Sequence, residues 1–180
     1  LGDLPEAERP PIMEIREWDG DRARDGWRQT IQLFDFPLNY QRSMENGLDF
    51  AHNEFVHPTH GFSYQHEDSY VVPPLDLREG PWGVGVTNRM FAPPLADPKM
   101  REASGRTSEN TFVTVDLGHV GAASLWTWIH PTEKFHIHQY LYERPVNRDR
   151  TLIYFVTLRN FLLDPAGDER MITRNAHVVH

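Results

Sequence analysis

One helix-patterned segment stands in a chain whose other regular segments favour β-strands. From Asn39 onward, apolar residues recur every three or four positions, as on the buried stripe of a helix: Tyr40, Met44, Leu48, Ala51 and Phe55. Before it, residues 27–36 alternate as in a strand, which Pro37 closes. This contrast predicts an α+β fold, in which a curled antiparallel sheet holds a long helix.

The rest of the chain is expected to be mostly strand and turn. Runs rich in β-branched and aromatic residues predict strands at 70–72, 83–91, 111–115, 123–129, 135–142 and 151–158. We expect the last two to form an antiparallel hairpin through residues 144–150, and residues 93–110 to form a long loop. Asp164-Pro165 is a helix start, with an acid at the N-cap and proline after it, so a helix is expected from there to the end.

The helical segment carries an acid and two histidines in the order Asp49-x2-His52-x4-His57. Imidazole and carboxylate ligands with open coordination positions are the set that ferrous iron uses to activate dioxygen. The alternative is a surface helix with scattered polar residues. Phe50 and Phe55, which are residues of a buried type, lie between the polar ones and weaken that alternative.

With Glu45 upstream, the segment reads Glu45-x3-Asp49-x2-His52-x4-His57. This resembles the mononuclear-iron signature E/D-x3-D-x2-H-x4-H of the Rieske non-heme iron oxygenases. The run Met-Glu-Asn-Gly-Leu-Asp and the opening Leu-Gly-Asp-Leu-Pro look most similar to the branch of demethylating and pheophorbide oxygenases. The resemblance implies a helix-grip fold that, with a C-terminal helix, encloses an apolar cavity.

The resemblance also implies a role for each residue of the motif. His52 and His57 would be ligands of a mononuclear Fe(II). Asp49 would accept a hydrogen bond from the second ring nitrogen of a ligand histidine, and would bridge to a Rieske-cluster histidine of a neighbouring subunit. Glu45 and Asn46 would lie near the iron and the subunit boundary; for Glu45 a solvated helix turn is the alternative.

A third iron ligand, a carboxylate, lies on the C-terminal helix in the family. The matching landmark here is Arg159-Asn-Phe-Leu-Leu-Asp-Pro, and by its spacing the ligand is expected beyond His180. Asp164 and Asp168 are the possible substitutes within the chain. We expect them instead to act as the N-cap and as a first-turn acid of that helix.

The chain contains no cysteine, so it cannot hold a Rieske [2Fe-2S] cluster, which needs two cysteines and two histidines. We therefore expect the cluster in an N-terminal domain outside this sequence. Residues 1–26 would be the lead-in from that domain, and 27–180 the catalytic iron domain, truncated at its C-terminus.

The expected function is that of an oxygenase that hydroxylates or oxidatively demethylates a small apolar or aromatic substrate with O2. Ring hydroxylation by a dioxygenase or a monooxygenase is equally compatible with the motif. Electrons would come from NAD(P)H through a reductase or ferredoxin, and the protein would be a homotrimer. The alternative is a non-catalytic helix-grip domain that binds a hydrophobic ligand, with the histidines incidental or binding zinc.

Charge and hydropathy restrict the partners and the location. The net charge of −8 argues against a nucleic-acid partner, because no basic surface is available to neutralise phosphates. No apolar run is long enough to cross a membrane, and we expect a cytoplasmic protein.

A second pair of histidines, His136 and His138, is separated by one residue in an expected strand, so both side chains should face the same side. No acid nearby in the sequence completes a metal site. We expect this pair to line the cavity or to lie on a surface face.

Overall fold

The computed structural model describes residues 3–52, 56, 74–91, 98–104 and 112–179. A sheet of seven antiparallel strands dominates it, in the order β3-β9-β8-β7-β6-β5-β4. The strands are β3 (Arg28–Phe36), β4 (Asp76–Gly80), β5 (Gly83–Phe91), β6 (Phe112–His119), β7 (Ser124–His130), β8 (Ile137–Asn147) and β9 (Arg150–Arg159). From β4 to β9 each strand pairs with the next one in the sequence, and β3 completes the edge beside β9.

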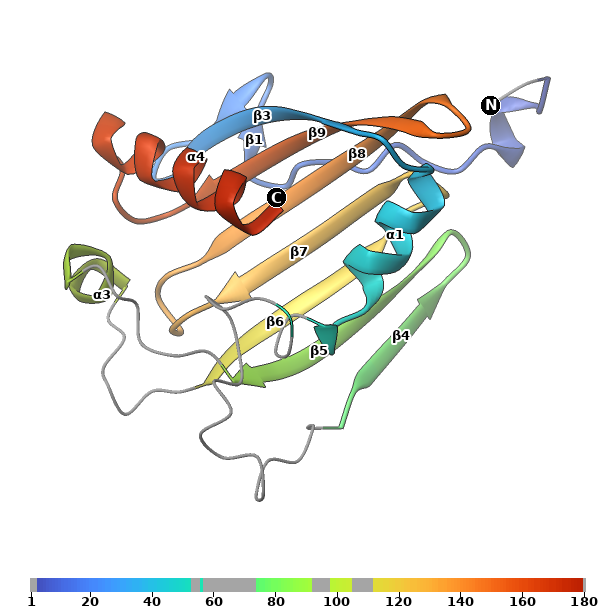
Figure 1. Ribbon diagram of the computed structural model, residues 1–180. Coiled ribbons are helices and arrows are strands. Elements are labelled where there is room, and N and C mark those ends of the chain that lie inside the picture. Colours follow the sequence, from blue (N-terminus) through green and yellow to red (C-terminus); the bar gives the residue numbers. More distant parts are fainter. Residues whose placement is uncertain (1–2, 53–55, 57–73, 92–97, 105–111, 180) are drawn as a thin grey trace.

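Two helices lie on the concave face of the curled sheet (Figure 1). They are α1 (Tyr40–Leu48), which crosses the middle strands, and α4 (Pro165–Val179), which lies along β3. Asn175 of α4 is 2% exposed and holds the helix on the sheet, because its Nδ2 donates to Gln32 Oε1 of β3 at 3.0 Å and to Thr157 Oγ1 of β9 at 2.9 Å. The α+β fold with a sheet gripping helices is thereby confirmed.

The opposite, convex face is covered by the first residues of the chain. These form a 3-10 turn η1 (Glu6–Glu8) and a short hairpin of β1 (Trp18–Asp19) and β2 (Arg22–Ala23). Met13 is buried there against Tyr140, Val156 and Leu158. The part of the expected lead-in from Met13 to Ala23 is thus packed onto the sheet.

Helix α1 is shorter than its apolar stripe predicts. It begins at an Asn39 N-cap, whose side chain accepts from the Gln41 N–H at 2.9 Å, and it ends at Leu48. Gly47 allows the close approach to the sheet, since a Cβ there would lie 2.6 Å from Cδ1 of Leu125. Helical geometry returns at residues 52 and 56, beyond a turn at Asp49.

Most strand predictions in the described residues are confirmed, including the 83–91 strand and the final β8–β9 hairpin. The loop expected at 93–110 contains a helix, α3 (Pro98–Ser104), and strand β4 was not predicted, because its side chains are exposed on both faces and lack the alternation of a half-buried strand. The strand expected at 70–72 lies outside the described residues. In the part of the chain that the structure describes, no helix is long and apolar enough to span a membrane.

Candidate active site

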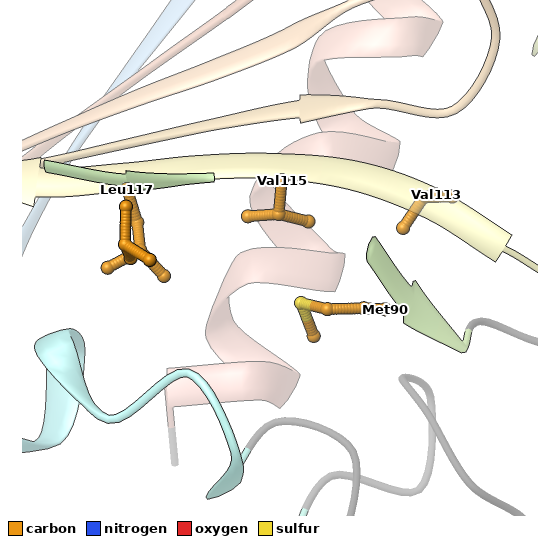
Figure 2. Packing of buried hydrophobic residues seen from close by; sticks show 5 residues of the cluster. Met90, Val113, Val115 and Leu117 are labelled. Atoms are coloured by element: carbon orange, nitrogen blue, oxygen red, sulfur yellow. The ribbon is translucent and has the colours of Figure 1, made fainter. Parts of the chain in front are cut away.

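A cavity of about 550 Å³ lies between the concave face and the two helices. Its wall is largely apolar, and Figure 2 shows four contributing side chains, Met90, Val113, Val115 and Leu117, projecting from β5 and β6. They face inward because alternate residues of a strand point to the same side. The polar residues in its wall include Asn46, His52, Thr127, Gln139 and Arg174. An apolar chamber with a few polar groups is the usual form of a small-molecule site.

His52 reaches this cavity from the turn that follows α1. The carboxylate of Asp49 caps that turn, since its Oδ1 accepts from the backbone N–H groups of Ala51 at 3.1 Å and His52 at 3.3 Å. The Nδ1 atom of His52 contacts the carbonyl oxygen of Asp49. A carbonyl only accepts, so Nδ1 carries the hydrogen and the lone pair lies on Nε2. That tautomer is the one in which a histidine binds metal through Nε2.

The other residues of the motif divide into three cases. Asn46 lines the cavity beside His52. Glu45 forms an exposed ion pair with Arg42 at 2.5 Å, and since Arg42 also lines the cavity, this pair lies at its edge. The structure places His52 and Asn46 in the cavity wall and Asp49 at the turn that carries His52. His57 lies outside the described residues, so the second histidine stays a prediction.

A buried acid under α1 was not found by sequence reasoning. Glu143 is only 5% exposed, and the Ser43 hydroxyl of α1 donates to its Oε1 at 2.6 Å. Burial raises the pKa of Glu143 to about 7, although the bond from Ser43 acts in the opposite direction. The available signal was strand alternation, because Glu143 lies two residues beyond Leu141 on β8 and therefore faces the same side of the sheet as this cavity residue.

The acids of the C-terminal helix serve its structure. Asp164 Oδ1 accepts from the Gly167 N–H at 2.6 Å, which confirms the predicted N-cap. Asp168 lies in the first turn as predicted, and it also binds Arg28 and the fully buried Arg159, each at 2.7 Å. Burial would raise the pKa of Asp168, but the two guanidinium groups hold it below its ordinary value. Both acids are engaged away from the cavity wall.

His136 and His138 do not face this cavity. They lie on the convex side of the sheet, where His130 from the end of β7 joins them. Sequence reasoning missed His130, which lies six residues before His136 but at the end of the preceding strand. It also missed the acids Glu17 and Asp116 that contact this group, because they are distant in sequence from the pair.

Comparison with known proteins places this geometry in context. The family model of the vanillate O-demethylase oxygenase C-terminal domain matches residues 36–180. No curated protein sequence matches the chain.

Solved structures resemble the fold at low sequence identity. The structure of dicamba monooxygenase bound to 3,6-dichlorosalicylic acid has a TM-score of 0.67 at 16% identity, over 86% of this chain and 46% of that one. The structure of NdmA from Pseudomonas putida CBB5 with caffeine has a TM-score of 0.67 at 16% identity, over 93% of this chain and 44% of that one. For the quaternary ammonium Rieske monooxygenase CntA with an inhibitor, the values are 0.56 and 14%, over 86% and 36%. The chain therefore spans less than half the length of each of these proteins.

Proposed function

Because the chain belongs to the vanillate O-demethylase oxygenase C-terminal domain family, we propose that it is the catalytic domain of an oxygenase that acts on a small apolar or aromatic molecule at a mononuclear Fe(II). The family confirms the resemblance to the Rieske oxygenases and to their demethylating branch. The observation that carries the proposal is His52 in the wall of an apolar cavity, with its ring orientation fixed by Asp49.

The residues present fit ferrous iron. His52 offers an imidazole in the tautomer with its lone pair on Nε2, and the adjacent backbone carbonyl is a usual outer partner for a metal-binding histidine. His57 would be the second ligand, and a carboxylate the third. Iron held in this way, with open positions, would supply the dioxygen chemistry.

Asp49 has two roles in this proposal. Its carboxylate caps the turn that carries His52, which sets the direction of the imidazole. The carboxyl group beside the iron ligand would also form the bridge by which electrons arrive from a Rieske cluster of a neighbouring subunit. The proposal accordingly includes a [2Fe-2S] cluster outside these residues, a reductase or ferredoxin, and a homotrimer.

Substrate binding falls to the cavity. Its volume of about 550 Å³ lies within the range of pockets for drug-sized molecules. Thr127 and Gln139 pair across β7 and β8 in an otherwise apolar stretch of the wall, so they are placed to hydrogen-bond a polar substituent and orient the ring. The related structures that hold 3,6-dichlorosalicylic acid and caffeine support a ring-containing substrate.

Iron-dependent oxygen consumption separates this proposal from a ligand-binding domain without catalysis. With the full-length protein, a reductase, NADH and a panel of methoxy- and methylamino-substituted aromatics, we expect consumption only when Fe(II) is loaded. It should be lost in His52→Ala and kept in His177→Ala, which replaces an exposed histidine of α4. Tight binding of apolar ligands with no iron uptake by the folded protein would favour the alternative.

A further inference from the structure

Three histidines form a compact group on the convex face, on the opposite side of the sheet from the cavity. They are His130 at the end of β7, His136 just before β8, and His138 within β8. One ring nitrogen of each lies within 4.8 Å of the corresponding nitrogens of the other two. The turn between the two strands brings them together, so the arrangement is built from adjacent sheet strands.

Two of these rings are held from outside by carboxylates. Asp116 Oδ2 lies 3.1 Å from His130 Nε2, and Glu17 Oε1 lies 2.7 Å from His138 Nδ1. Because an ionised carboxylate accepts, each of those nitrogens carries the hydrogen, and the lone pairs lie on His130 Nδ1 and His138 Nε2. Acid–histidine pairs of this form are the usual outer support of metal-binding imidazoles.

Glu17 is a specific anchor and not a chance neighbour. It is 2% exposed, and it also accepts from the Tyr140 hydroxyl at 2.8 Å. The Glu17 carboxylate therefore holds the His138 ring from a fixed, buried position.

The inward nitrogens are poised for a shared ligand. His138 Nε2 is buried and has no hydrogen-bond partner within the described part of the chain. His130 Nδ1 and His136 Nδ1 are 2.8 Å apart. Since His130 accepts there, His136 donates, and a metal would require only that His136 move its hydrogen to Nε2.

We propose that His130, His136 and His138 form a second metal site, for a divalent transition ion of the zinc class, separate from the proposed iron site. Three imidazole nitrogens at zinc bonding distance of one ion are about 3.3 Å from one another in a tetrahedral site. The observed separations, from 2.8 Å to at most 4.8 Å, bracket that value.

His130 and His136 also line a second cavity of about 850 Å³, together with Thr132, Glu133 and Lys134. A water molecule from this cavity would complete the tetrahedron. Glu17 belongs to the N-terminal segment and contacts His138, so a bound ion would help to hold this segment on the sheet. Because the ion would bind the folded state, it would also stabilise the fold by mass action.

The test is metal binding to the folded chain carrying His52→Ala and His57→Ala, which removes the proposed iron site. We expect about one equivalent of Zn²⁺ by equilibrium dialysis, the visible bands of four-coordinate Co²⁺, and a raised melting temperature with Zn²⁺. In the same background, Asp116→Asn should weaken Zn²⁺ binding by about 10- to 100-fold, as loss of an outer partner does. His136→Ala should abolish the Co²⁺ bands, and the exposed control His177→Ala should change neither measurement.

Two results would overturn the proposal. One is that the folded protein carrying only His52→Ala and His57→Ala binds no Zn²⁺ at micromolar concentration. This result does not depend on whether variants of His130, His136 or His138 fold. The other is Zn²⁺ binding that persists unchanged when His130 and His136 are replaced by Ala. Because neither arm involves O2 or substrate, the outcome is independent of the proposed oxygenase function.

Discussion

Glu143→Gln tests whether a buried acid under α1 makes the stability of this fold fall as the pH rises. The carboxyl group is 5% exposed and accepts a hydrogen bond from Ser43. A glutamine of nearly the same shape keeps that acceptor and cannot ionise. The variant therefore isolates the cost of ionising a carboxyl group between helix and sheet.

The magnitude follows from the pKa of Glu143, which burial raises from 4.5 to about 7. Between these values the folded protein keeps a proton that the unfolded chain has lost, so the free energy of unfolding decreases as the pH rises through this window. At about 1.4 kcal/mol for each pH unit, the full decrease is about 3 kcal/mol. The Gln variant lacks this contribution at every pH.

The assay is urea denaturation of both proteins at pH 4.5 and pH 8. We expect similar stabilities at pH 4.5, and at pH 8 a variant that is more stable than the wild type by about 2–3 kcal/mol. Glu169→Gln, which replaces an exposed acid of α4, is the matched control and should show no such difference between the two pH values. A Gln variant that is equally or less stable at pH 8 would refute the reasoning.

Three further substitutions test the fold and the site. Asp168→Asn removes the acid that pairs with the fully buried Arg159, so urea denaturation should show a loss of about 3 kcal/mol; an unchanged midpoint would contradict this. Gly118→Ala places a Cβ 2.4 Å from the carbonyl oxygen of Val84 on the neighbouring strand, so the melting temperature should fall by at least about 3 °C, which corresponds to about 1 kcal/mol. Asp49→Ala and Asp49→Asn should both retain iron but stop turnover. Only the Asn variant keeps a side-chain oxygen that can cap the turn, so iron loss in the Ala variant alone would show that the cap, and not the bridge, is the role of Asp49.

The strands could be predicted because each has a local signal. The β-branched and aromatic residues of 83–91 and 151–158, and the Asp164-Pro165 helix start, are local features of the sequence, and the structure reproduces the elements that they predict closely. The end of α1 could not be predicted in this way. Its apolar stripe continues to Phe55, but the turn at Asp49 is stabilised by a side-chain cap that competes with the helix.

For a related reason, the residues of the site could be predicted only in part from the sequence. The spacing of the motif led to His52, which lines the cavity, and to Asp49, whose carboxylate caps the turn that carries His52. Long-range partners gave no such signal. Glu17 lies 121 residues from His138 in the sequence, and only the packing of the N-terminal segment on the convex face brings them into contact.

The most direct test of the central claim is anaerobic Fe(II) loading of the full-length protein, addition of nitric oxide, and EPR spectroscopy. We expect a high-spin iron–nitrosyl signal that is lost in His52→Ala and retained in His136→Ala. A signal that survives in His52→Ala and disappears in His136→Ala would contradict it, because the iron would then belong to the histidines of the convex face.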